Sequence, residues 1–176
     1  ATTLVSRRIT RFLSERLVFN GHVQRTYLNQ THLKQWGVTA EPCFQVARGI
    51  LDPSYGLHRV SAGQWVLETG DGYESSRPLT PGWLRGFQEH CSGQPILLMP
   101  HARRVVVVDS AQTQDVLVAW TQSARAFETE ANPLSPRAYV DDTASGLRPW
   151  QPPEAHPLSG QLRDAERRLF AYEYNN

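Results

Sequence analysis

The stretch ILLMPHARRVVVVDS, residues 96–110, decides the fold. It holds two predicted strands, ILLMP and RVVVVDS, that are separated by only three residues, His101, Ala102 and Arg103. Continuous apolar runs of this length are typical of strands that are covered on both faces, and so short a connection joins antiparallel neighbours. The stretch therefore predicts two adjacent antiparallel strands at the centre of a sheet.

The segments on either side alternate between helical and strand patterns. Residues 113–130 place apolar side chains at helical spacing and predict a long helix, and residues 133–142 predict a proline-bounded edge strand. On the other side, residues 57–69 read as two short strands around a Ser-Ala-Gly turn, and residues 81–91 read as a helix with Pro81 in its first turn.

The first 51 residues predict three helices and a hairpin. Residues 3–17 show apolar side chains at helical spacing with arginines opposite, which indicates an amphipathic helix. Asn20-Gly21 predicts a tight hairpin turn. Asn29 is a helix N-cap residue for a short helix that ends at Gly37, and Thr39 begins another.

Strands in adjacent pairs, rather than single strands alternating with helices, predict an α+β fold: a mainly antiparallel sheet with helices packed on it. We expect a single domain over residues 1–145. Residues 146–160, GLRPWQPPEAHPLSG, are rich in proline and predict a linker or an ordered arm. Residues 161–176 predict a C-terminal helix.

Composition excludes several classes of function. The formal net charge of +1 lacks the broad basic excess of a general nucleic-acid binder, so nucleic acid is not an expected partner. Cys43 and Cys91 lack the spacing of a metal site, and no nucleotide-binding motif occurs, so we expect no metal and no cofactor. Without a signal-peptide pattern or an apolar run of about 20 residues, we expect a cytoplasmic protein that does not enter membranes and has free thiols.

The segment ETGDGYESSR, residues 68–77, is the main candidate site. Asp71 and Glu74 act as an acid/base pair only if the segment is a turn, because an extended strand points them to opposite faces. The competing interpretation is a glycine-rich turn in which Asp71 caps backbone amides. Glu74 is the better functional candidate of the two acids, because a turn does not by itself require an acid at position 74. Arg77 is the expected local ion-pair partner of Glu74.

Four further residues are candidates for binding or catalysis. Tyr73 lies between the two acids, and His101 lies in the tight turn of the central hairpin, next to Arg103. Trp150 is flanked by prolines outside the obvious core, which is typical of an aromatic side chain that docks either on its own domain or on a partner.

Several of these pieces resemble the C-terminal part of the YtpQ-like family of bacterial proteins. The resemblance runs over about residues 17–140, and its anchor residues are Gly72, Tyr73, Glu74, Ser76, Pro100, Asp109 and Ser110. This chain departs from the family pattern at Arg103-Arg104, where the family tends to have an Arg-Asp pair. The resemblance implies a cytosolic bacterial α+β domain and no particular reaction.

Taken together, the sequence predicts a non-enzymatic protein-interaction module. The partner is another protein or a second copy, bound through the proline-rich arm and the C-terminal helix. The alternative is an enzyme or small-molecule-binding domain with a carboxylate site at residues 68–77.

Overall fold

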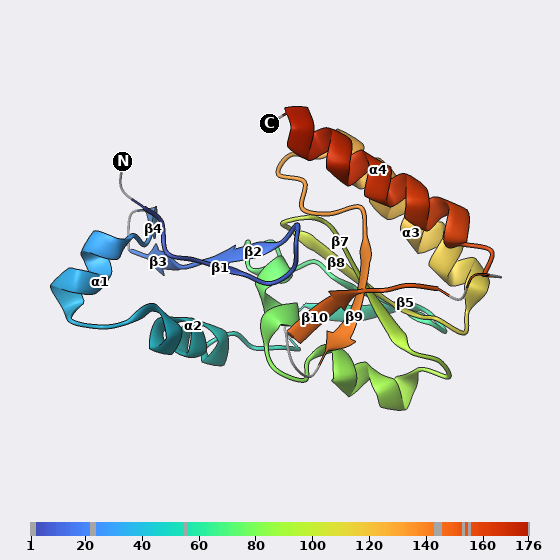
Figure 1. The fold of residues 1–176 in the computed structure, drawn as a ribbon. Coiled ribbons are helices and arrows are strands. Elements are labelled where there is room, and N and C mark those ends of the chain that lie inside the picture. Colours follow the sequence, from blue (N-terminus) through green and yellow to red (C-terminus); the bar gives the residue numbers. More distant parts are fainter. Residues whose placement is uncertain are drawn as a thin grey trace.

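The computed structural model describes residues 3–21, 24–54, 56–142, 146–152, 154 and 156–175. Its centre is a six-stranded sheet in the order β10-β9-β7-β8-β6-β5 (Figure 1). All pairings within it are antiparallel. The strands are β5 (Leu57–Ser61), β6 (Gln64–Leu67), β7 (Pro95–His101), β8 (Arg104–Asp109), β9 (Ala138–Asp142) and β10 (Gly146–Pro149).

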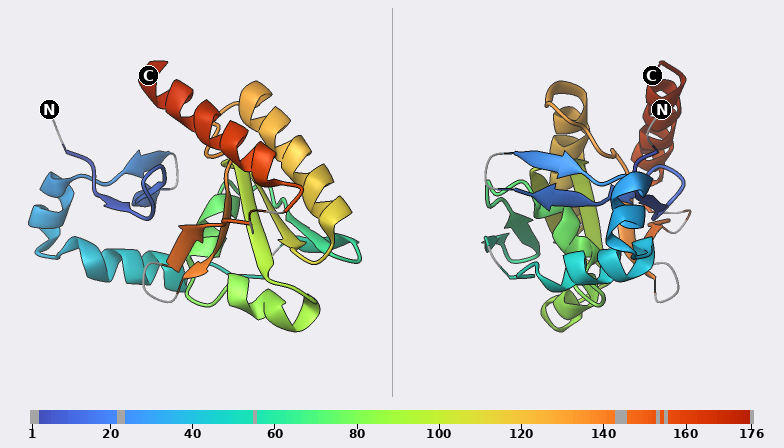
Figure 2. Two further views of the ribbon diagram at one scale, coloured as in Figure 1. Left: turned by 45° about the vertical axis from the view of Figure 1, so that its right-hand side comes forward. Right: turned by 90° about the vertical axis from the view of Figure 1, so that its left-hand side faces the viewer.

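The sheet is covered on both faces, which explains the continuous apolar runs of β7 and β8. Ile96, Leu98 and Val106 face a core built with α3 (Thr113–Thr129) and α4 (Ser159–Asn175). Leu97 and Val107 face the opposite core, under two 3₁₀ segments, η1 (Glu74–Leu79) and η2 (Leu84–His90). Figures 1 and 2 show α3 and α4 side by side. The predicted α+β class and the predicted central hairpin are therefore confirmed.

Residues 3–50 form a smaller body beside the sheet, which we call the N-terminal unit (Figure 2). It holds two antiparallel strand pairs and two helices. The elements are β1 (Ser6–Arg8), β2 (Ser14–Arg16), β3 (Val18–Asn20), β4 (Arg25–Tyr27), α1 (Gln30–Trp36) and α2 (Ala40–Gly49). Its own core contains five buried hydrophobic residues: Val5, Leu17, Leu28, Leu33 and Phe44.

The predicted helix over residues 3–17 is wrong, because this segment forms the β1–β2 hairpin. The Thr10 hydroxyl accepts hydrogen bonds from the backbone N–H groups of Phe12 and Leu13 at 3.3 and 3.2 Å and reverses the chain. On either side of that turn burial alternates with the strand period rather than the helical period. Leu13 and Ile9, spaced as in a helix, pack from this turn onto the sheet core.

The rest of the N-terminal unit follows the sequence more closely. The hairpin β3–β4 is present, but residues 21–24 connect its strands and Asn20 pairs with Arg25, so the two-residue Asn-Gly turn is wrong. Asn29 caps α1 by accepting from the N–H groups of Thr31 and His32, and Gly37 ends it with φ +66°, as predicted. Thr39 precedes α2, also as predicted.

Two other boundaries differ from the sequence prediction. The strand predicted at the edge, β9, lies inside the sheet, because residues 146–149 add β10 outside it. The helix predicted to start at Pro81 is the 3₁₀ segment η2 and begins at Leu84, since Gly82 has φ +76°. Of the two alternatives for residues 146–160, the described part is ordered: β10 is paired, and both Leu147 and Leu158 are buried. No helix in the described part of the chain combines the length and the apolarity needed to cross a membrane.

Candidate functional site

The segment 68–77 leaves the end of β6, makes a loop over residues 68–73 and enters η1. Gly70 and Gly72 have φ +76° and +79°, as the sequence predicted for a glycine-framed turn. A Cβ atom at Gly72 would lie 2.6 Å from Nη1 of Arg25, which comes from β4. The loop is therefore shaped both by its own backbone and by the N-terminal unit that packs on it.

Asp71 organises this turn. Its Oδ1 accepts from the Tyr73 N–H at 2.8 Å, and its two oxygens accept from Nη1 and Nη2 of Arg77 at 3.2 and 2.6 Å. The hydrogen bonds from Arg77 are the main reason that the pKa of Asp71 lies well below its usual range, against a smaller opposing effect of burial. Asp71 is therefore ionised at neutral pH and acts as a structural anion, not as a general acid.

Glu74, which the sequence favoured over Asp71 as a functional acid, is fully buried. Its Oε1 accepts from the backbone N–H groups of Thr69 and Gly70 at 3.1 and 2.6 Å. The Thr69 hydroxyl lies 2.9 Å from Glu74 Oε1 and 2.8 Å from Asp71 Oδ1, so its single hydrogen serves one carboxylate at a time. Oε2 of Glu74 accepts no hydrogen bond from any described residue. Glu74 thus fastens the loop to the start of η1.

Among the ion pairs of the described residues, Arg77 pairs with Asp71 rather than with Glu74, so the predicted local ion pair is wrong. It is 3% exposed, and its Nε donates to the carbonyl oxygen of Asp52 at 2.8 Å. The neighbouring carbonyl, that of Pro53, accepts from Trp83 Nε1 at 2.8 Å. Together these contacts anchor the segment that follows α2 to the six-stranded sheet and the helices that cover it, which we call the sheet domain.

Tyr73 contacts the N-terminal unit. The Arg25 guanidinium carbon lies 4.7 Å from the centre of the Tyr73 ring, and Arg25 Nη2 donates to the carbonyl oxygen of Asp71. This cation–π contact was not foreseen, because no local sequence signal connects Arg25 with Tyr73 or with Asp71, which lies 46 residues further along the chain. The candidate binding residue Tyr73 therefore serves, in this structure, to dock β4 on the loop.

The other candidates do not converge on the loop's carboxylates. His101 lies in the β7–β8 connection, where its Nδ1 accepts from the Arg103 N–H at 3.3 Å, and Arg103 itself is exposed. Trp150 is 6% exposed and packs against Trp120, with ring centroids 5.9 Å apart. Trp150 thus docks on its own domain, which is the first of the two alternatives that its sequence context left open.

Cys91 is no better suited to nucleophilic chemistry. Burial raises its pKa to about 11, with a further contribution from the negative charge of Asp109. It is therefore a thiol at neutral pH. Cys43 and Cys91 are both free.

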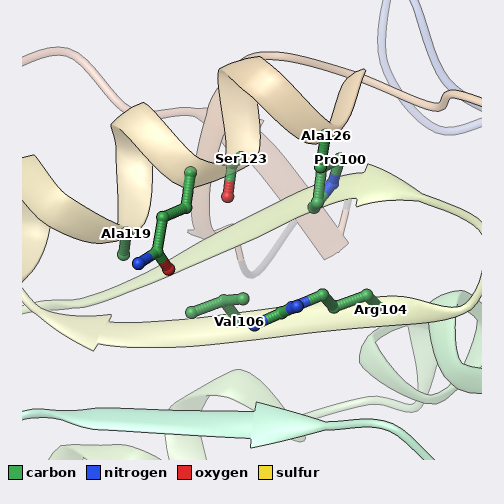
Figure 3. A pocket seen from close by; sticks show the side chains of 7 residues that line it. Pro100, Arg104, Val106, Ala119, Ser123 and Ala126 are labelled. Atoms are coloured by element: carbon green, nitrogen blue, oxygen red, sulfur yellow. The ribbon is translucent and has the colours of Figure 1, made fainter. Parts of the chain in front are cut away.

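Two cavities lie elsewhere in the molecule. One, of about 30 Å³, lies between α3 and the β7–β8 pair and is lined by Pro100, Arg104, Ser123 and neighbouring apolar side chains (Figure 3). It has room for about one water molecule. A larger hollow of about 340 Å³ lies between the last turns of α3 and α4. Its charged lining residues Glu128 and Arg168 are paired with each other at 2.6 Å, and neither cavity is lined by residues 68–77.

Asp109 is a structural residue that sequence reasoning did not assign. Its carboxylate is 3% exposed and accepts from the backbone N–H groups of Ser92, Gly93 and Ala111 at 2.8 to 3.0 Å. The adjacent Ser110 hydroxyl accepts from the Gln94 N–H at 2.7 Å. A strand that ends in Asp-Ser before a turn is the signal that would have identified this cap.

These contacts define a class of site: a cross-linked loop that ties three parts of the chain together. It has no pair of carboxylates open to solvent, and the described residues contain no cluster of three or more His, Cys, Asp or Glu side chains able to hold a metal ion. Comparisons of the chain with protein-family models, with curated proteins and with solved structures found no match.

Proposed function

We propose that the protein is a non-enzymatic protein-interaction module and that its main docking surface lies on the N-terminal unit. The observation that carries the proposal is a pair of large apolar side chains left in solvent on one helix face. Val46 and Ile50 of the α2 segment are 66% and 77% exposed and lie four residues apart, on the same side of the helix. Exposed apolar side chains that cluster in this way mark contact surfaces, whereas scattered ones do not.

A second exposed pair lies on the same unit. Phe19 of β3 and Trp36 of α1 are 57% and 51% exposed, and their ring centroids lie 6.5 Å apart. Large aromatic side chains are enriched at protein interfaces. Among the described residues of the N-terminal unit, five buried hydrophobic residues form its own core, which is small beside the large apolar side chains that the unit exposes.

The terminal helix is a second contact surface in the proposal. Tyr172 and Tyr174 of α4 are 43% and 92% exposed, and Tyr172 lines the hollow between α3 and α4. The proline-rich arm does not contribute Trp150, whose ring is used in the core. Self-association through α4 and binding of a different protein through α2 are both within the proposal.

The loop at residues 68–77 supports the non-enzymatic part of the proposal. Its acids are engaged in structural hydrogen bonds: Glu74 is buried and Asp71 is paired with the buried Arg77. We also propose a cytosolic bacterial protein related to the YtpQ-like family. The residues that carry this resemblance include Gly72, Glu74 and Asp109.

The test compares the wild-type chain with the Val46→Glu/Ile50→Glu variant. Each bait is cross-linked in a lysate of the native host, captured proteins are quantified, and self-association is measured by sedimentation. The matched control is Val60→Glu/Val118→Glu, which adds the same charge at exposed apolar positions of β5 and α3. We expect the wild type and the control to capture the same protein, or to form the same dimer. The Val46→Glu/Ile50→Glu variant should lose that protein or that dimer. The same captured proteins and the same mass for all three chains would refute the docking surface.

A further inference from the structure

The two faces of the β1–β2 hairpin differ in charge. Residues opposite each other in the hairpin are Ser6 and Arg16, Arg7 and Glu15, and Arg8 and Ser14. Since side chains alternate along a strand, Arg7 and Glu15 lie on one face, and the other four residues lie on the opposite face. All four are exposed. Tyr27, 53% exposed, pairs with Val18 two residues after Arg16, which extends this face onto β4. We call Ser6, Arg8, Ser14, Arg16 and Tyr27 the arginine face.

The acidic residues of the N-terminal unit are used on the other side of the hairpin. Glu15 accepts from Arg7 Nε at 2.6 Å and from Arg48 Nη2 at 3.0 Å, and Glu41 accepts from Arg7 Nη1. These are the only two acidic residues among the first 50, against seven Arg and Lys. Among the described residues, no carboxylate pairs with Arg8 or Arg16.

The whole-chain charge conceals this separation. Residues 1–50 carry a net charge of +5, and the remainder, with eleven basic and fifteen acidic residues, carries −4. The value of +1 for the whole chain is the difference between two oppositely charged parts. Charge asymmetry of this kind is typical of proteins that bind an anionic polymer.

We propose that the arginine face binds a single strand of nucleic acid. Arg8 and Arg16 are diagonal neighbours across the hairpin, so their guanidinium groups lie within reach of successive phosphates, with the hydroxyls of Ser6 and Ser14 beside them as further donors. Tyr27 supplies an exposed ring on which a base can stack. An acidic peptide would pair with the arginines, but it would gain little from the exposed ring of Tyr27, because among the described residues no apolar hollow beside the ring could hold a peptide side chain. The nucleic acid is therefore the better match. This surface is distinct from the α2 face of the proposed protein interaction.

The test is fluorescence anisotropy with a labelled oligothymidylate and oligouridylate of about 16 nucleotides. We expect binding that weakens as salt rises from about 50 to about 200 mM. The Arg8→Ala/Arg16→Ala variant should reduce the slope of log affinity against log salt by about 1.4, since each phosphate contact on a single strand contributes about 0.7. Tyr27→Ala should weaken binding at least about fivefold with the slope unchanged, and Tyr27→Phe should retain it.

The matched control is Arg148→Ala/Arg163→Ala, which removes two exposed arginines from β10 and α4. Thermal melting of every variant checks the fold. An equal loss of affinity in this control would overturn the proposal, because it would indicate attraction to net charge alone. Absence of oligonucleotide binding at low salt would also overturn the proposal. If polyglutamate were to bind instead, and its binding were to depend on Arg8 and Arg16, the ligand would be an acidic peptide rather than a nucleic acid. Failure of this test leaves the α2 interaction experiment unaffected, because the two use different residues and different probes.

Discussion

The sheet domain and the N-terminal unit are built on opposite principles. In the sheet domain both faces of β7 and β8 are buried, and both Val106 and Val107 are less than 5% exposed. In the N-terminal unit, arginines and large apolar side chains of α2 stay in solvent while five residues make the core. The sheet domain is therefore stabilised by its own packing, whereas the surface of the N-terminal unit is better suited to contact other molecules.

The largest expected effect tests this contrast directly. Val106→Asp places a charge without a partner between the sheet and α3, and the variant should fail to fold at ordinary temperature, a loss of more than about 4 kcal/mol. Val46→Asp makes the same change on the exposed face of α2 and should cost less than about 1 kcal/mol. Circular dichroism and thermal melting measure both. Similar melting temperatures for the two variants would remove the distinction between the regions.

The next effect concerns the ion pair at the junction of the two regions. Asp71→Asn removes the carboxylate that pairs with the buried Arg77 guanidinium and should cost about 3 kcal/mol at pH 7. Asp141→Asn, which breaks the exposed pair with Arg85, should cost less than about 1 kcal/mol. Denaturant unfolding curves give both values. Equal losses of unfolding free energy in the two variants would mean that burial of Arg77 does not strengthen its ion pair with Asp71.

The same pair predicts a pH dependence. The pKa of Asp71 is lowered in the folded chain from its ordinary value of 3.8, chiefly by the hydrogen bonds of Arg77. Its stabilisation is thus fully present above about pH 4 and is lost as the pH falls through the folded-state pKa. The stability difference between wild type and Asp71→Asn should narrow steadily below about pH 4. A difference that stays constant down to about pH 2 would contradict this assignment.

A smaller effect is expected at the buried acid. Glu74→Gln replaces two charge-assisted hydrogen bonds from Thr69 and Gly70 with neutral ones and buries an amide NH₂ where Oε2 has no partner, at a cost of about 1 to 3 kcal/mol. Glu68→Gln changes an exposed acid six positions earlier and should be nearly neutral. If Glu74→Gln melts like the wild type, Glu74 does not hold the loop.

The sequence predicted those parts of the fold whose pattern has a single physical explanation. The apolar runs of β7 and β8 permit only buried strands, and the Asn29 and Gly37 caps mark both ends of α1. Residues 3–17 failed because Ile9, Leu13 and Leu17 satisfy helical spacing, while the hydroxyl of Thr10 reverses the chain between them. Nothing near residues 146–149 indicated a strand, because β10 exists only through its pairing with β9.

The candidate site divides in the same way. The glycine-rich turn and the capping role of Asp71 are local features, and they agree with one of the two interpretations that the sequence allowed for this segment. The hydrogen bond from Arg77 to the carbonyl oxygen of Asp52 was not predicted, because Asp52 is 25 residues away in the chain. The charge difference between the N-terminal unit and the rest of the chain was missed for a different reason. The net charge was taken over all 176 residues, and the positive and negative parts cancel in that sum.

The smallest expected effect measures how tightly the two regions are joined. Gly72→Ala and Gly70→Ala both place a Cβ at a positive φ, of +79° and +76°, and each should cost about 1 kcal/mol for that reason alone. At Gly70 the new methyl group meets no atom within 4 Å, whereas at Gly72 it lies 2.6 Å from Nη1 of Arg25 and must displace that side chain from Tyr73. The excess cost of Gly72→Ala over Gly70→Ala therefore reports the Arg25 contact, and we expect it to be about 0.5 to 1 kcal/mol, as for an exposed cation–π pair. In the Arg25→Ala background the two alanine substitutions should become equal, because the side chain that distinguishes them is gone. If the excess persists in that background, the N-terminal unit is held to the loop by contacts other than Arg25.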